Sequence, residues 1–74
     1  MMNIKVGQVL EFIVPVQVEG RSIATGTRVR IGHIMSEIQE PKLTLILLGG
    51  DKPETLIVNR HEVTLNCRVV SEPS

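Results

Sequence analysis

The chain has 74 residues, of which 42% are hydrophobic and 22% are charged, and its eight Lys and Arg residues balance eight Asp and Glu residues. This composition excludes a disordered chain, and the length fits a single domain over 1–74. The absence of net charge excludes a long-range field that would steer the protein toward nucleic acid or an anionic membrane. Phe12 is the only aromatic residue, so we expect an aliphatic core.

Apolar residues recur mainly with a period of two, which predicts strands rather than helices. The first predicted strand covers 8–19, where the even positions from Leu10 to Val18 are all apolar. Pro15 interrupts it and requires an edge position or a local break in the hydrogen-bond ladder. Residues 19–26 follow as a predicted loop that holds one apolar residue, Ile23.

The second predicted strand, 27–38, changes its inward-facing positions halfway. Val29 and Ile31 are apolar at odd positions, whereas Ile34 continues the pattern at an even position. One extra residue in a strand, a β-bulge, produces this shift and bends the strand. We therefore predict a bulge at Gly32, a residue type that tolerates the unusual dihedral angles of some bulges.

The remaining elements are shorter. They are a turn at 39–42, a strand at 43–48, a turn at 49–54, a strand at 55–58, a one-turn connector at 59–62 and a last strand at 63–70. Within the last strand, the alternation predicts that Val63, Leu65, Cys67 and Val69 share one face. We expect the termini, 1–6 and 71–74, to be frayed.

Five strands in up-and-down order, with a long early loop and a short link before the last strand, predict an all-β fold. Over 8–70 this layout resembles a small five-stranded SH3-like barrel, in which closure removes exposed sheet edges. An OB-like barrel is the alternative, although 49–54 has no room for the helix that this fold usually carries. The resemblance is one of layout alone and implies no function.

Few residues in this sequence are candidates for chemistry. His33, His61 and Cys67 lack the close spacings of a metal site, and Cys67 has the phase of a core residue. The acidic residues are scattered, and the glycines of 49–54 do not form a phosphate-binding motif. We therefore expect no metal, no cofactor and no enzymatic activity.

Three arginines, Arg28, Arg30 and Arg68, share an outward phase on the predicted strands. A patch of this kind suggests a nucleic-acid-binding small barrel as an alternative function. Small barrels that bind single strands use stacked aromatic side chains, which this chain lacks. Because Glu11, Gln17 and Glu19 are expected to face outward on a neighbouring strand, we predict that they pair with these arginines.

The strand at 43–48 is apolar on both faces. If Leu43, Leu45 and Leu47 point inward, Ile46 and Leu48 emerge on a surface that no predicted helix covers. Ile13 and Ile57 are expected to join them, and a contiguous apolar patch on a small domain indicates a protein interface. The sequence thus predicts a non-catalytic protein–protein interaction module, a homo-oligomer or a small accessory subunit of a larger assembly.

The sequence also predicts a compartment. A single cysteine cannot form an intramolecular disulfide, which favours a reducing environment. The first residues do not resemble a secretion signal, and no apolar run approaches the length of a membrane span. We expect a cytoplasmic protein that does not contact membranes.

Overall fold

The computed structural model describes residues 3–35 and 41–73. These residues form seven short strands and one helix, so the chain is mostly β, as predicted. The elements are β1 (Val9–Phe12), β2 (Val16–Val18), β3 (Arg21–Ile23), β4 (Arg28–Met35), β5 (Lys42–Leu47), β6 (Glu54–Asn59), α1 (Arg60–Asn66) and β7 (Cys67–Ser71). The end of the second predicted strand, 36–38, and most of the turn at 39–42 lie outside the described residues.

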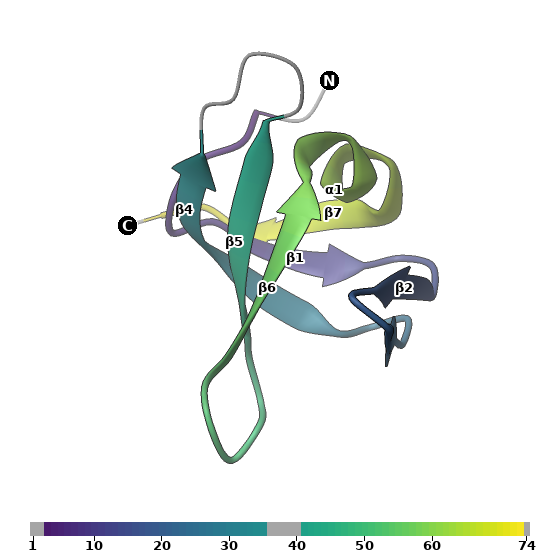
Figure 1. Cartoon of the computed structure of the whole chain (residues 1–74). Helices are drawn as coiled ribbons and strands as arrows, with labels where there is room; N and C mark the ends of the chain where they lie inside the picture. The colour runs from purple at the N-terminus through teal and green to yellow at the C-terminus, as the bar shows by residue number, and fades with distance from the viewer. Residues whose placement is uncertain (1–2, 36–40, 74) are drawn as a thin grey trace.

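Five strands form one antiparallel sheet with the order β6-β5-β4-β1-β7 (Figure 1). The other two, β2 and β3, form a separate hairpin. Within the described residues, no strand pairing joins β6 to β7 or either of them to the hairpin. The chain therefore has a small, mostly β fold, but the predicted closed barrel is not confirmed.

The predicted bulge lies in β4, the longest strand. Ile31 pairs with Leu45 of β5, whereas His33 pairs with the next residue along, Thr44, so Gly32 is the extra residue. Val29 and Ile31 are buried before the bulge, and Ile34 packs against the core after it. This confirms the predicted change of face within one strand.

The reason for glycine at this bulge differs from the expected one. The φ angle of Gly32 is not in the left-handed region, so the backbone does not require glycine there. A Cβ atom on Gly32 would instead lie 3.0 Å from Cδ1 of Ile46 and 3.3 Å from its Cγ1. Glycine at this position leaves room for a side chain of the neighbouring strand.

The first predicted strand is interrupted at Pro15, which is one of the two alternatives that the proline predicted. The predicted loop at 19–26 is partly wrong. Its first half turns back as a hairpin, in which Val18 pairs with Arg21 across a two-residue loop. Both loop residues, Glu19 (φ 50) and Gly20 (φ 77), have positive φ angles. Two positive angles in a two-residue loop characterise a type I′ turn, which fits the twist of paired strands.

The prediction of one helical turn at 59–62 and a strand from residue 63 is wrong. The chain forms a helix over Arg60–Asn66, and the last strand begins only at Cys67. Val63 is fully buried, as predicted, but Leu65 is 61% exposed because two residues along a helix do not share a face. The acidic Glu62 in the first turn suits the positive end of the helix dipole.

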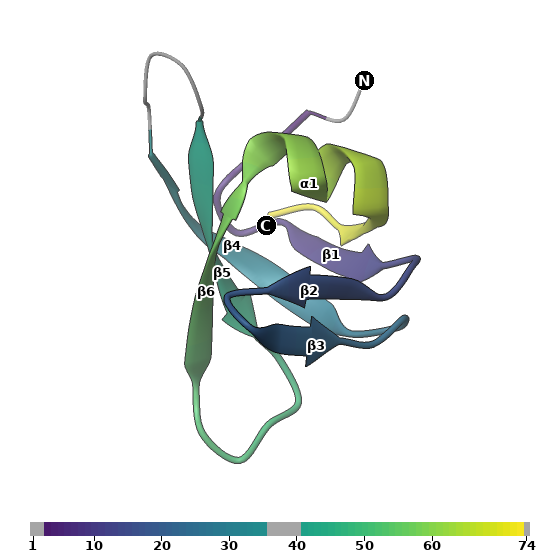
Figure 2. The ribbon, with the colours of Figure 1, turned by 45° about the vertical axis from the view of Figure 1, so that its right-hand side comes forward.

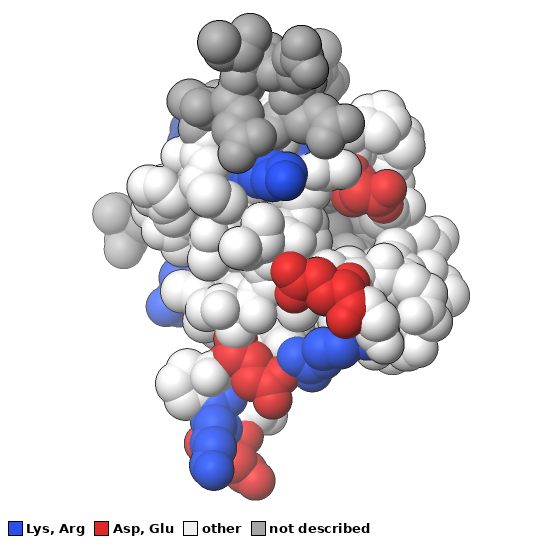
Figure 3. All heavy atoms as spheres, in the orientation of Figure 1, with Lys and Arg blue, Asp and Glu red and all other residues white. Residues whose placement is uncertain are grey.

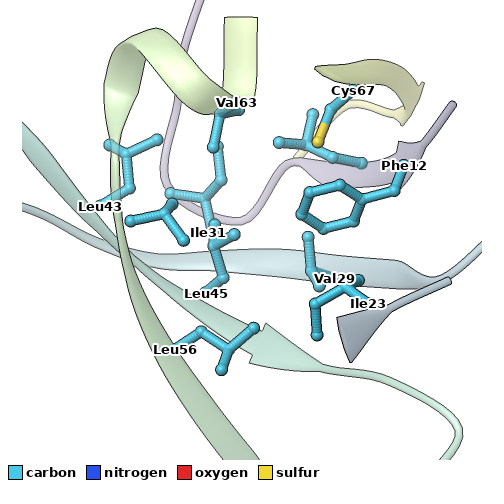
Figure 4. Packing of buried hydrophobic residues seen from close by; sticks show 11 residues of the cluster. Phe12, Ile23, Val29, Ile31, Leu43, Leu45, Leu56, Val63 and Cys67 are labelled. Carbon is cyan, nitrogen blue, oxygen red and sulfur yellow. The ribbon is translucent and has the colours of Figure 1, made fainter. Parts of the chain in front are cut away.

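The hydrophobic core lies between the sheet, the hairpin and the helix. In Figure 4, side chains from several elements point toward one another, among them Phe12 of β1, Leu45 of β5 and Val63 of α1. Figure 2 shows the hairpin beside β1, α1 above both, and β4 running from beside β5 to pass behind the hairpin. The helix and the hairpin therefore cover the inner face of the sheet and leave its outer face without a described element over it.

One buried polar residue, Gln8, joins the two ends of the described chain. Its side chain is 1% exposed, and its Nε2 donates a hydrogen bond to the Asn3 carbonyl oxygen at 3.0 Å. Nε2 also lies 3.3 Å from Oε1 and 3.4 Å from Oε2 of Glu72, while the Lys5 amide donates to Oε1 of Gln8 at 3.3 Å. Every polar atom of this buried side chain therefore has a partner, as burial requires.

Candidate interaction surface

The outer face of the five-stranded sheet holds most of the residues that the sequence singled out. Leu43 and Leu45 are fully buried, which confirms that the odd positions of β5 point inward. The even positions, Ile46 and Leu48, lie on the opposite side and are half-buried. We call this side of the sheet the outer face. The side chains on it that the argument uses are Val9, Glu11, Arg28, Arg30, Thr44, Ile46, Leu48, Ile57 and Arg68.

The strand register arranges these side chains in rows across the sheet. Ile46 lies between Arg30 of β4 and Thr55 of β6, and Arg30 in turn pairs with Val9 of β1. Side chains directly opposite each other in an antiparallel pair are close enough to interact. The aliphatic side chains of this face are therefore interleaved with guanidinium groups.

Ile46 and Leu48 are less exposed than the sequence suggested. Ile46 extends over the bulge, where the terminal carbons of its side chain occupy the space beside Gly32. The amide of Leu48 donates a hydrogen bond to the Arg28 carbonyl oxygen at 3.0 Å, which extends the pairing of β5 with β4 by one residue. Both side chains thus present part of their surface rather than all of it.

Two of the predicted interface residues are strongly exposed but lie in different places. Ile57, on β6 opposite Thr44, is 47% exposed and lies on the same side of the sheet as Ile46. Ile13 is 48% exposed and follows the end of β1, where its amide donates to the Asn66 carbonyl oxygen at 2.8 Å. The structure therefore brings Ile57 diagonally across from Ile46, but the register leaves Leu48 four positions from the residue opposite Ile57, and it does not bring Ile13 to Ile46.

Ile13 instead lies beside two exposed aliphatic residues that the sequence reasoning missed. Val14 follows it directly and is 41% exposed, and Leu65 precedes its hydrogen-bond partner Asn66 in the chain. On the outer face, Glu11 lies in one row with Arg28 and Arg68, and Val9 lies in the next row with Arg30. The row of Glu11 therefore lies between Ile13 and the row of Val9. Leu65 escaped the sequence reasoning because its alternation with Val63 suggested an inward strand position.

Two of the three arginines are held by one carboxylate. Glu11 Oε2 accepts hydrogen bonds from Arg68 Nε at 2.8 Å and forms an ion pair with Arg68 Nη2 at 2.7 Å. Arg28 Nε lies 3.5 Å from the other oxygen of Glu11. The hydrogen bond from Arg68, followed by the charges of both arginines, lowers the pKa of Glu11 below its ordinary value of 4.5.

Arg30 differs from the other two arginines. It is exposed in the next row of the outer face, and it forms no ion pair within the part of the chain that the structure describes. The predicted pairing is therefore confirmed for Glu11 with Arg28 and Arg68 only. Within the described residues Glu19 forms no ion pair with these arginines, and Gln17 lies in the separate hairpin and bonds Ser22 instead. The three guanidinium groups and one carboxylate leave an excess of positive charge on this face.

The other charged side chains are mixed in sign. Figure 3 shows acidic and basic groups side by side over β6 and along the turn between β5 and β6. Arg21 of β3 and Glu54 of β6 form an ion pair across this region. Charges alternate here over short distances, so this side presents no extended field of one sign.

One hollow of about 650 Å³ lies between β3 and the turn that follows β5. Its lining includes Arg21, Ile23, Leu47, Lys52 and Glu54, and no histidine or cysteine of the described residues contributes to it. His33 and His61 are both exposed, on β4 and α1, whereas Cys67 is buried in the core. Burial raises the pKa of the Cys67 thiol to about 12, which removes its nucleophilic form at neutral pH.

Neither a metal centre nor a membrane-spanning helix emerges from the described residues. Over 3–35 and 41–73, the His, Cys, Asp and Glu side chains do not gather in groups of three or more that could hold a metal ion. The helix within these ranges is too short to cross a bilayer.

Comparison with known proteins found no matching family model, no matching curated protein and no matching solved structure.

Proposed function

We propose that this chain is a non-catalytic protein-interaction module that works through the outer face of its sheet. The observation that carries the proposal is the position of Ile46 and Leu48 on the side of β5 that faces away from the core. Ile57 lies on the same side of the sheet, on β6, and also lines a hollow with Val18 of the hairpin and Glu62 of α1. Arg30 lies beside Ile46 and Arg28 beside Leu48, and arginine is enriched at protein interfaces. The module is either a homo-oligomer or a small accessory subunit of a larger assembly.

The proposal includes an SH3-like barrel. The strand order places β1 between β4 and β7, the hairpin occupies the long early connection and a helix links β6 to the last strand. Val18 of β2 and Val58 of β6 line one hollow, so the hairpin lies alongside the edge of the sheet that a barrel would bring to it. An OB-like barrel is less well supported, because the described link from β5 to β6 contains no helix.

The aliphatic side chains alone are too few to hold a stable complex. Full burial of such a side chain contributes about 1.5–3 kcal/mol. Ile57 is 47% exposed, and Ile46 and Leu48 already have most of their surface buried, so together the three supply about 1–3 kcal/mol. A micromolar complex requires about 8 kcal/mol after the costs of association. A partner must therefore also use the polar groups of the outer face.

The remaining expectations stay part of this proposal. Among the described residues that line the hollows, no titratable side chain is buried, so we propose no enzymatic activity and no cofactor. A lone buried thiol suits the reducing cytoplasm, which is the proposed location. Nucleic-acid binding is not favoured, because Glu11 places a carboxylate between two of the three arginines.

The test is a variant in which Ile46→Lys and Leu48→Glu are combined. Both side chains are half-buried at the surface, so the fold should persist while self-association or the recovery of a partner is lost. Light scattering after size-exclusion chromatography reports the oligomeric state, and affinity purification from the source cells reports partners.

Ile13→Lys provides the matched control, because Ile13 is as exposed as Ile57 but lies away from the outer-face patch. It should leave the oligomeric state and any partner unchanged. A wild-type protein that stays monomeric at high concentration, and recovers no partner that the double variant loses, would contradict the proposed function.

A further inference from the structure

The charges of the outer face determine which partner it suits. Arg28, Arg30 and Arg68 carry three positive charges there, and Lys42 of β5 adds a fourth at an even position of that strand. The negative charges are those of Glu11 and, at the edge of the face, Glu72, which lines one hollow with Arg30 and is hydrogen-bonded to Gln8. Glu11 is already bonded to two of the arginines, and the guanidinium group of Arg30 forms no ion pair within the described residues. Arg30 also lies directly beside Ile46, the central aliphatic residue of the patch.

A second copy of the chain is a poor occupant for this face. In a two-fold dimer the same patch lies on both subunits, so two positively charged faces would meet, and Glu11 of each copy is already bonded to its own Arg28 and Arg68. Like charges opposed across an interface are strongly unfavourable. The half-buried aliphatic residues offer too little area to offset this repulsion.

Nucleic acid also fits this face poorly. A phosphate backbone near Arg28 and Arg68 would approach the carboxylate of Glu11 that holds them. Single-stranded nucleic acid would find no aromatic side chain on which to stack, because the only one, Phe12, is buried. Ile46 and Leu48 present aliphatic surface instead, which an aliphatic side chain of a protein can cover.

We propose, on the basis of the proposed function, that the outer face binds an acidic, aliphatic-rich segment of another protein. Carboxylates of the segment pair with Arg30 and with the exposed part of Arg28, while its aliphatic side chains cover Ile46 and Leu48. Arg28 and Arg30 are two residues apart on β4, so their Cα atoms are about 6.6–6.8 Å apart along the strand. Acidic residues at alternate positions of an extended segment have the same spacing.

In the first test, each of three probes is added to the isotopically labelled 74-residue chain. Binding is measured from the shifts of the backbone amide resonances of the chain. The probes are a soluble synthetic peptide that alternates Glu with Leu and Ala, the same peptide with each Glu replaced by Lys, and an oligodeoxythymidine. We expect the Glu peptide alone to shift the amides of β4 and β5, and we expect added salt to weaken its binding. Equal binding of the Lys peptide, stronger binding of the oligonucleotide or shifts confined to the Ile13 end would overturn the inference.

Charge reversal provides the second arm. Arg30→Glu should weaken binding of the Glu peptide by about tenfold or more and should allow the Lys peptide to bind. Arg60→Glu is the matched control, because Arg60 is an exposed arginine on α1 outside the outer face. Equal losses in the two variants would show that net charge, rather than the outer face, governs binding, and would overturn the inference.

A third arm separates this inference from the proposed function. A photo-reactive amino acid replaces Thr44, which lies on the outer face beside Ile57. The variant is irradiated in an extract of the source cells, and the peptide cross-linked to it is sequenced. An acidic cross-linked segment that Arg30→Glu abolishes supports the inference. A protein cross-link to a non-acidic segment overturns the inference alone, whereas absence of any protein cross-link from the wild-type face overturns both.

Discussion

Replacing Gln8 by Ala should destabilise this protein more than any other single exchange of a polar side chain in the described chain. The Gln8 side chain is almost fully buried and bonds three separate backbone or carboxylate groups near the two ends. Alanine would leave the Lys5 amide and the Asn3 carbonyl without this partner. It would also leave a small cavity in place of the amide group.

The expected magnitude follows from these contacts. A neutral hydrogen bond contributes about 0.5–1.5 kcal/mol, and a buried polar group left without a partner costs about 1–3 kcal/mol. The bonds of Gln8 are 3.0–3.4 Å long, toward the weak end of the range, so we expect a loss of about 2–3 kcal/mol. For a domain of this size the loss corresponds to a decrease in Tm of about 8–24 °C.

Urea unfolding followed by circular dichroism measures this loss. Gln17→Ala is the matched control, because Gln17 is exposed and bonds only the Ser22 hydroxyl, at 2.8 Å. It should change the free energy of unfolding by less than about 0.5 kcal/mol. If Gln8→Ala proves as mild as Gln17→Ala, the argument that Gln8 holds the two ends together is wrong.

Three further predictions follow from the bulge, the bridging carboxylate and the thiol. Gly32→Val should cost about 1–3 kcal/mol through crowding against Ile46, and Ile46→Val in the same protein should recover part of the loss in urea unfolding. The hydrogen bond from Arg68 lowers the pKa of Glu11 in the folded protein. The Glu11 carboxylate therefore stabilises the fold fully at a pH above its ordinary pKa of 4.5, and this stabilisation is lost as the pH falls through the lowered pKa. The stability gap between wild type and Glu11→Gln should therefore be larger at neutral pH than in acid, and a pH-independent gap would contradict this. Cys67, with a pKa raised to about 12, should resist iodoacetamide in the folded protein at mildly alkaline pH and react once urea unfolds it.

The sequence predicted the features that depend on local pattern. The inward positions of β4 and β5 followed from period-two alternation, and the bulge followed from a change of phase beside Gly32. Both signals require only a few neighbouring residues, because alternate residues of a strand face opposite sides. The ion pair between Glu11 and Arg68 followed from the same phases once the two strands were neighbours.

The helix α1 could not be predicted from alternation, because Val63 and Leu65 fit a strand as well as a short helix. A helix of seven residues gains little from its own hydrogen bonds, so packing of Val63 in the core decides its conformation. One usable signal was overlooked. Asn59, a good N-cap residue type, is followed three positions later by Glu62, which is a typical spacing at a helix start.

The candidate surface was only partly predictable for a similar reason. Alternation indicates the face on which a side chain lies, but it does not indicate the row, which depends on the register between strands. Ile13 and Ile46 were therefore grouped by phase alone, although the row of Glu11 separates Ile13 from Val9 and the row of Ile46. The positions of Val14 and Leu65 beside Ile13 depend on the helix and could not be found without it.

The pairing of β1 has a consequence for how the chain acquires its fold. One side of β1 pairs with β4, whereas the other pairs with β7, so that Phe12 lies opposite Cys67 near the far end of the sequence. Closing such a long loop carries an entropic cost before its contacts form, which slows folding relative to chains with local pairings. During synthesis, β1 remains an unpaired edge, and the side of the core near Leu10 and Phe12 stays open until Cys67–Ser71 has left the ribosome. Nascent chains stalled before this strand should therefore bind chaperones or aggregate, whereas completed chains fold.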